Sequence, residues 1–251
     1  MSAKKILLAS LLLTILLLPI GEASAAMLAS DYHAINCPVG QVCTPAVQAV
    51  NPEQSEPEKV IYLTFDDGPD PNWTPQILDI LDRYHAGATF YMIGRNAVTF
   101  PEVVRQVAEH KQRIAIHGYN HMDMSNLDYQ TFYLEVNDSE SVILAALQAE
   151  PNLASQYVRC LRPPYGLTSN YLYQTAHQMG YEISMWNIDT NDWQQPDPDD
   201  MLADILKILE PGKVILMHDG GKEREKTLLG LQLILHELIM QGYRIEPLCN
   251  Y

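Results

Sequence analysis

Residues 60–69 read Val-Ile-Tyr-Leu-Thr-Phe-Asp-Asp-Gly-Pro, and the rest of the chain can be organised around them. The first six are mostly apolar or β-branched, which is typical of a buried strand. This strand would deliver two adjacent carboxylates, Asp66 and Asp67, into a Gly-Pro turn. Neighbouring carboxylates repel each other, so the arrangement becomes reasonable if one binds a metal ion and the other takes a proton.

Two histidines, His117 and His121, follow about fifty residues after the carboxylate pair. Imidazoles at positions i and i+4 can face one ion from a single turn of chain, so they could complete a metal site with one carboxylate. A solvated acidic turn and two unrelated histidines would explain either motif taken alone. The motifs further along the chain favour the metal site.

The first 25 residues have the pattern of a secretory signal peptide. Lys4 and Lys5 precede the apolar run Ile6–Ile20, and Ala23-Ser24-Ala25 is a small-residue cleavage site. The apolar run is shorter than the roughly 20 residues that a membrane-spanning helix needs. We therefore expect cleavage after residue 25, a secreted or periplasmic protein, and no membrane span after cleavage. An uncleaved membrane anchor is the alternative.

The chain is acidic, with a formal net charge of −15 and no visible basic patch. Nucleic acids and anionic membrane surfaces attract basic proteins, so neither is an expected partner. The charge does not predict a specific partner, because acidity also serves solubility.

Four cysteines in a secreted chain suggest disulfides, and four allow three pairings. We favour a small loop closed by Cys37 and Cys43, which lie close in the sequence. For Cys160 and Cys249, a disulfide and two buried free thiols explain the sequence equally well.

Residues 26–58 are an N-terminal extension that ends in a polar segment, residues 51–58. A domain follows at residues 59–251. Within this domain, predicted strands alternate with amphipathic helices. The strands are expected at Val60–Phe65, Ala88–Ile93, Arg113–His117, Tyr157–Arg162, Glu182–Asp189, Lys213–His218 and Tyr243–Leu248. The helices are expected near Pro75–His85, Pro101–His110, Tyr129–Leu147, Ser169–Met179, Pro198–Leu209 and Thr227–Gln241.

Local signals mark several helix ends. Thr74-Pro75 and Asp128 are expected to begin helices. Gly87, Gly180 and Gly242 each stand between a helix and the next strand, where a helix C-cap needs positive φ.

The alternation favours parallel strands joined by crossover helices. It predicts an α/β fold, a distorted (β/α) barrel with about seven parallel strands, and an open doubly wound sheet is the alternative. The chemically active residues fall at C-terminal strand ends, which form the active face of such barrels. They are Asp66, Asp67, His117, Arg162, Asp189 and His218.

At these positions the chain resembles the NodB-type polysaccharide deacetylases of carbohydrate esterase family four, over about residues 59–247. The five motifs of the family appear in order and are together highly specific. They read Thr64-Phe65-Asp66-Asp67-Gly68-Pro69, His117-x-x-x-His121, Arg162-Pro163-Pro164-Tyr165-Gly166, Asp189-Thr190-Asn191-Asp192-Trp193 and Ile215-Leu216-Met217-His218-Asp219.

The resemblance implies a role for each matching residue of the metal site. Asp66 would be the catalytic base, and Asp67, His117 and His121 would bind the metal. One carboxylate and two imidazoles suit Zn²⁺, with Co²⁺ or Ni²⁺ as alternatives, and leave a coordination position open for water and substrate. Arg162 would pair with Asp66 and favour its charged form.

The remaining motifs imply groups that act on the substrate. The backbone N–H of Tyr165 would stabilise the oxyanion. His218 would be the general acid, with Asp192 raising its pKa. Trp193 and Leu216 would line the acetyl pocket, although core packing would also explain both. Two further tryptophans carry no family role: Trp73 could stack on a sugar ring or cover the barrel mouth, and Trp186 is expected in the core.

Three positions depart from the family pattern. Gly118 stands where Ser or Thr is common, Ile116 where Asn is common, and Arg113 where an acidic residue is frequent. These changes remove expected hydrogen bonds around the metal loop and leave the ligands in place. They predict weaker metal binding with an unchanged reaction type.

The sequence thus predicts a secreted, zinc-dependent hydrolase that removes N-acetyl groups from N-acetylglucosamine units of a polysaccharide. Chitin oligomers and peptidoglycan are the expected substrates, and the protein is expected to be a monomer. An acetylxylan O-deacetylase of the same family is the first alternative. A catalytically silent glycan-binding protein is the second, but it would not need the proton-transfer groups.

Overall fold

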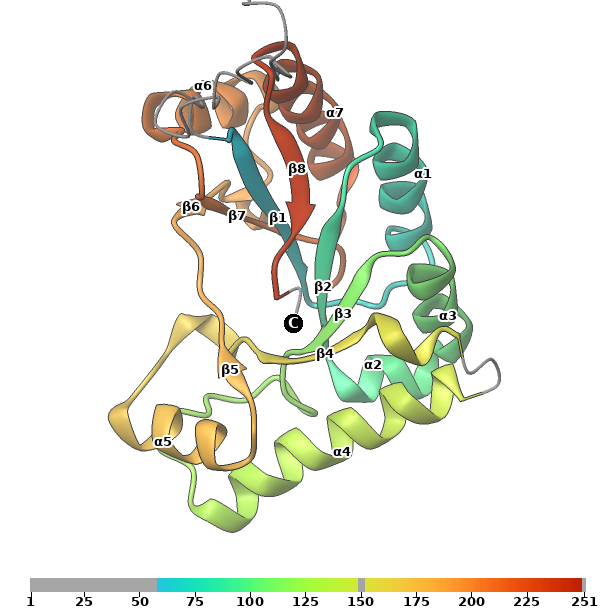
Figure 1. The fold of residues 1–251 in the computed structure, drawn as a ribbon, viewed down its shortest axis with the longest axis vertical. Coiled ribbons are helices and arrows are strands. Elements are labelled where there is room, and N and C mark those ends of the chain that lie inside the picture. Colours follow the sequence, from blue (N-terminus) through green and yellow to red (C-terminus); the bar gives the residue numbers. More distant parts are fainter. Residues whose placement is uncertain (1–57, 149–151, 250–251) are drawn as a thin grey trace, which may run out of the picture. The chain divides into compact units, whose positions relative to one another are not determined.

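The computed structural model describes residues 58–148 and 152–249, in which parallel strands form one sheet with helices packed around it (Figure 1). The strands are β1 (Val60–Asp66), β2 (Ala88–Met92), β3 (Arg113–Ile116), β4 (Tyr157–Leu161), β5 (Glu182–Ile183), β6 (Ile188–Asp189), β7 (Val214–His218) and β8 (Arg244–Pro247). The helices are α1 (Thr74–Tyr84), α2 (Gly94–Thr99), α3 (Pro101–Glu109), α4 (Tyr129–Leu147), α5 (Asn170–Gln178), α6 (Pro198–Ile208) and α7 (Glu225–Met240). Three short 3₁₀ helices cover Ala154–Gln156, Pro164–Gly166 and Asp192–Gln194.

The described strands lie in the order β5-β4-β3-β2-β1-β7-β6, and β8 pairs with the first half of β1. All the pairings are parallel, which confirms the distorted barrel. The sheet is curled (Figure 1). Its two edge strands, β5 and β6, follow each other directly in the chain. Within residues 58–148 and 152–249 these two edges do not pair, so the barrel is open between them.

The prediction of one continuous strand over Glu182–Asp189 is wrong, because residues 184–187 separate β5 from β6. The carbonyls of Ser184 and Met185 accept hydrogen bonds from the Arg162 guanidinium, at 3.2 and 3.4 Å. A side chain thus satisfies backbone groups that a strand neighbour would otherwise bind. This division explains why the sheet has eight strands where seven were predicted.

The hydrophobic core is one large cluster, to which β1 contributes, and a small second cluster that includes Tyr91, Cys160 and Cys249. Ile61, Leu63 and Phe65 are almost fully buried. The apolar faces of the surrounding helices complete this core, as Ile77 of α1 and Val107 of α3 illustrate. The core holds the C-terminal ends of the strands at one edge, where the predicted site residues lie.

Most of the helix signals are confirmed. The Asp128 carboxylate accepts a hydrogen bond from the Thr131 N–H and caps α4, and Gly180 and Gly242 adopt φ of 77° and 82°. The prediction for Gly87 is wrong. His85 takes the left-handed conformation after α1.

Gly87 has a different reason to be glycine, because a Cβ there would lie 2.5 Å from the Pro247 ring. Thr74 begins α1 but does not cap it, because its hydroxyl donates to the Asp219 carboxylate at 2.6 Å. Helix α2 was not predicted.

A disulfide joins Cys160 in β4 to Cys249 after β8, and so decides the question that the sequence left open. The predicted Cys37–Cys43 loop, the signal peptide and the extension lie outside the described residues. Among the helices that are described, none is long and apolar enough to cross a membrane.

Candidate functional site

The carboxylate pair lies at the C-terminal end of β1, a strand whose apolar side chains are buried in the core. Asp66 is buried, and Asp67 follows it with φ of 76°, in the left-handed region. The Gly68 N–H donates to the Asp219 carboxylate at 3.0 Å, and a Cβ on Gly68 would lie 2.1 Å from the same group. Only glycine allows this close approach, so Gly68 and Asp219 together fix the turn after the pair.

Asp67, His117 and His121 form the one cluster of three or more potential metal ligands among the described residues. The ligand atoms lie within 4.8 Å of one another. Asp67 Oδ1 is 3.1 Å from His121 Nε2 and 3.6 Å from His117 Nε2. Tetrahedral zinc with bonds of about 2.0–2.1 Å would place its donors about 3.3 Å apart, so this set fits a zinc-sized ion.

Asp67 Oδ1 supports the same interpretation, because it is buried without a hydrogen-bond partner among the described residues. His121 Nε2 lies 3.1 Å from this oxygen, but no hydrogen bond of acceptable geometry joins the two atoms. Burial opposes the charge on Asp67, yet the imidazole of His121 and the charges of His117 and His218 lower its pKa to about 2. Burial lowers the pKa of His117. An ionised carboxylate and a neutral imidazole are the forms that bind metals.

The orientation of His117 is fixed by a backbone group. Its Nδ1 lies 2.7 Å from the carbonyl oxygen of Arg162, which can only accept a hydrogen bond. Nδ1 therefore carries the proton, and the lone pair of Nε2 faces the carboxylates. A carbonyl partner of this kind commonly orients histidines that bind metals.

Arg162 forms a buried ion pair with Asp66. Its guanidinium is fully buried, and Nη1 donates to Asp66 Oδ1 at 2.8 Å and to the Thr64 hydroxyl at 2.9 Å. The ring of Tyr91 lies 4.1 Å under the guanidinium. Asp66 Oδ2 lies 3.7 Å from His117 Nε2 and is left facing the metal ligands.

His218 and Asp192 form a second hydrogen-bonded pair at the site. Asp192 is fully buried; its Oδ1 accepts from His218 Nδ1 at 2.7 Å, and its Oδ2 accepts from the His218 N–H and the Thr227 hydroxyl, each at 2.9 Å. Burial opposes protonation of His218, but the hydrogen bond and charge of Asp192 outweigh it and raise the pKa of His218 to about 9. At neutral pH the imidazole therefore carries a proton.

Tyr165 lies over His121 at the mouth of the site. Its ring meets the His121 ring edge-on with centroids 4.7 Å apart, and its hydroxyl donates to the His121 carbonyl at 3.2 Å. The backbone of Tyr165 has φ of 61°, and its N–H donates to no carbonyl in the described part of the chain. Left-handed conformations of large residues are costly and gather at functional sites.

A cavity of about 490 Å³ connects these groups. Its lining includes both carboxylates of the pair and both metal-site histidines, together with Tyr165, Gly166, Trp186, Asp189, Trp193, Leu216, His218, Gly221, Lys222 and Arg224. The side chain of Trp193 is 48% exposed at the rim. Trp73 is absent from the lining among described residues and immediately precedes α1, so its stacking on a sugar stays a prediction.

Some residues of this site were missed by sequence reasoning. Trp186 is half-buried and lines the cavity, so its prediction as a core residue is wrong. It sits in the break between β5 and β6, which no local signal revealed. Asp219 was also given no role from the sequence, although it directly follows His218 in the last motif. Burial raises the pKa of Asp219 to about 7, and the charges of Asp67 and Asp66 act in the same direction.

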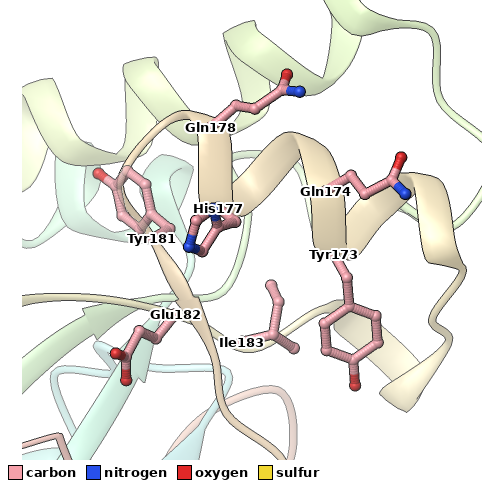
Figure 2. A pocket seen from close by; sticks show the side chains of 7 residues that line it. All are labelled: Tyr173, Gln174, His177, Gln178, Tyr181, Glu182 and Ile183. Atoms are coloured by element: carbon pink, nitrogen blue, oxygen red, sulfur yellow. The ribbon is translucent and has the colours of Figure 1, made fainter.

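A second hollow of about 590 Å³ lies between α5 and β5 (Figure 2). It is lined by Tyr173, Gln174, His177, Gln178, Tyr181, Glu182 and Ile183. Figure 2 shows that these side chains come from α5, the edge strand β5 and the turn between them, and none belongs to the metal-ligand cluster. His177 therefore belongs to no cluster of three potential ligands among the described residues, although Glu182 lines the same hollow.

Comparison with known proteins gives consistent matches. The profile of a family described as polysaccharide deacetylase matches residues 53–184. A peptidoglycan-N-acetylglucosamine deacetylase of Bacillus cereus is 37% identical over 189 residues, which cover 74% of this chain and 85% of the relative. A chitooligosaccharide deacetylase of Bradyrhizobium is 32% identical over 200 residues, covering 75% of this chain and 88% of the relative.

Solved structures show the same fold. A peptidoglycan N-acetylglucosamine deacetylase superposes with a TM-score of 0.71 at 30% identity, covering 76% of this chain and 87% of that one. A protein of Bacillus anthracis described as a pseudoenzyme of carbohydrate esterase family four gives 0.69 at 26% identity, covering 76% and 64%. The fold alone is thus shared by active and inactive proteins.

Proposed function

Because the chain belongs to the polysaccharide deacetylase family, we propose that it is a secreted hydrolase that removes N-acetyl groups from N-acetylglucosamine units of a polysaccharide. One observation carries the proposal. Asp66, which is paired with the buried Arg162, and His218, which is paired with the buried Asp192, line one cavity together with a metal-ligand cluster.

The donor set of Asp67, His117 and His121 fits Zn²⁺, and Co²⁺ or Ni²⁺ could replace it. A zinc ion bound there would lower the pKa of a water molecule and polarise the acetyl carbonyl. The three residues leave a position open on the cavity side, as a catalytic site requires.

The other residues would handle the protons and the developing charge. Asp66 Oδ2 would accept a proton from the attacking water while Arg162 holds Oδ1 in place. The free N–H of Tyr165 would donate to the oxyanion. His218, protonated and oriented by Asp192, would give its proton to the departing amine. Trp193, Leu216 and Trp186 would exclude water around the acetyl group.

Chitin oligomers and peptidoglycan are the proposed substrates, because relatives of this chain are described as peptidoglycan-N-acetylglucosamine and chitooligosaccharide deacetylases. Two alternatives remain within the same fold, an acetylxylan O-deacetylase and a silent glycan-binding protein. The intact pairs of Asp66 with Arg162 and Asp192 with His218 argue against silence. A protein that only binds glycans would not need a buried guanidinium to orient Asp66 as a base.

Acetate release from a panel of substrates tests the proposed function. The secreted form should release acetate from chitooligosaccharides or peptidoglycan faster than from acetylxylan. Release from acetylxylan alone would identify an esterase. No release from any polymer, together with measurable glycan binding, would identify a silent binder.

Replacing Asp192 with asparagine should shift the pH profile. His218 must be protonated to act as an acid, so the rate falls as pH rises through its pKa, which Asp192 raises to about 9. Loss of the Asp192 charge lowers that pKa, and the alkaline limb should move to lower pH. The pH dependence of kcat/KM measures this shift. An unchanged profile and rate would show that the two residues are not coupled.

A further inference from the structure

Glu135 is a buried carboxylate of α4 whose hydrogen bonds all reach the turn between the two histidine ligands. It is only 4% exposed. Its Oε2 accepts from the backbone N–H groups of Tyr119 and Asn120, at 2.7 and 2.9 Å. Its Oε1 accepts from the Asn120 side-chain amide at 2.6 Å. Glu135 of α4 therefore binds both Tyr119 and Asn120, which lie in the middle of the turn between His117 and His121.

This carboxylate has no cationic partner. Among the ion pairs of the described residues, none includes Glu135, although its helix neighbour Glu140 pairs with Arg159 at 2.8 Å. Burying an unpaired carboxylate is costly unless hydrogen bonds stabilise it. Three N–H donors from the turn supply those bonds, so the ordering of Glu135 and the ordering of the turn depend on each other.

The backbone of the turn needs such support. Gly118 has φ of 74° and His121 has φ of 57°, and the second is an uncommon conformation for a bulky residue. A Cβ on Gly118 would lie 3.2 Å from Glu135 Oε2, so glycine both permits the conformation and leaves room for the carboxylate. The loop hydrogen bonds that Gly118 was expected to remove are supplied here from α4.

We propose that Glu135 is a positioning residue that holds the turn so that both imidazoles face Asp67. The inference rests on the proposed metal site at Asp67, His117 and His121. Glu135 does not touch the ligands' ring nitrogens; it acts through the backbone that carries them. The geometry requires a side chain long enough to accept hydrogen bonds from the turn, and it does not require a negative charge.

Two conservative variants separate reach from charge. Glu135→Asp keeps the charge but withdraws the carboxylate by about one carbon–carbon bond, ~1.5 Å, which takes both backbone N–H groups out of hydrogen-bond range. Glu135→Gln keeps the reach and one oxygen for those two N–H groups, while the Asn120 amide can turn to accept from the new NH₂. Glu140→Gln is the matched control, because it removes a carboxylate of the same helix without touching the turn.

The measurements are zinc affinity of the stripped protein by chelator competition and the absorption spectrum of the Co²⁺-loaded protein. Neither requires turnover, so their outcome is separate from that of the proposed activity. Glu135→Asp should bind zinc about 10–100-fold more weakly, the usual effect of removing an outer partner of metal ligands. Its Co²⁺ spectrum should change. Glu135→Gln and Glu140→Gln should stay within a few-fold of the parent, with the parent spectrum.

Other outcomes overturn the proposal. Parent-like affinity and spectrum in Glu135→Asp would show that Glu135 only stabilises α4. Equal weakening in Glu135→Asp and Glu135→Gln would assign the effect to charge. If all variants, including the control, lose affinity together with thermal stability, the effect is general unfolding and Glu135 has no specific role.

Discussion

Replacing Asp66 with asparagine should lower turnover by roughly 10²–10⁴, the usual effect of losing a positioned general base. The amide oxygen can still accept from Arg162 Nη1, which holds Asp66 Oδ1 at 2.8 Å, so the geometry below the site should survive. The atom that changes is the one facing the cavity, and an amide nitrogen cannot take a proton from water. Zinc content and glycan affinity should stay near the parent values, and acetate release measures the loss.

Asp189→Asn is the control for this variant, because it removes another carboxylate that lines the same cavity. The Asp189 carboxylate accepts a hydrogen bond from the Asn191 N–H and is not among the hydrogen-bond partners of Arg162 in the described residues, so its loss should reduce turnover far less. A mutant at Asp66 that loses zinc would show that Asp66 is itself a ligand and that the two members of the pair are wrongly assigned. A parent without activity and a mutant with unaltered glycan binding would point to a silent binder.

Removing the metal should abolish activity, and adding Zn²⁺ or Co²⁺ to the stripped protein should restore it. Asp67 Oδ1 is buried without a hydrogen-bond partner among the described residues, which supports metal binding there. The bound metal would activate the attacking water, so turnover should depend on it. Elemental analysis and acetate release, measured on the same samples, test the prediction. Full turnover in thoroughly stripped protein would refute the ligand assignment.

His121→Gln should lose most of the bound zinc and the activity with it. His177→Gln is the matched control, because His177 lines the second hollow (Figure 2) and belongs to no cluster of three potential ligands among the described residues. It should keep the parent metal content. Equal metal loss in both variants would show that the bound ion is held elsewhere on the chain.

Much of the site could be predicted from sequence because its residues belong to short local patterns. The apolar run before Asp66 indicated a buried strand, and the i, i+4 spacing of His117 and His121 indicated one turn of chain. Alternating strands and helices indicated parallel pairing. Parallel strands bring their C-terminal ends to one edge, so the patterns also predicted that these side chains would lie together.

Features that depend on contacts between distant segments could not be predicted. The break between β5 and β6 exists because the Arg162 guanidinium binds the carbonyls of Ser184 and Met185, and that break places Trp186 in the cavity. Local periodicity cannot report a side chain that competes with strand pairing from more than twenty residues away.

The sequence alone thus indicated the parallel α/β architecture, the order of the motifs and the candidate ligand types, because spacing and periodicity encode each of them. Only the tertiary structure joined Cys160 to Cys249 and brought Glu135 to the turn that Gly118 opens. It also showed why the turn after Asp67 must hold glycine, since the Asp219 carboxylate occupies the space beside it. These are close approaches of groups far apart in the chain, and they are decided by packing, which a single sequence does not display.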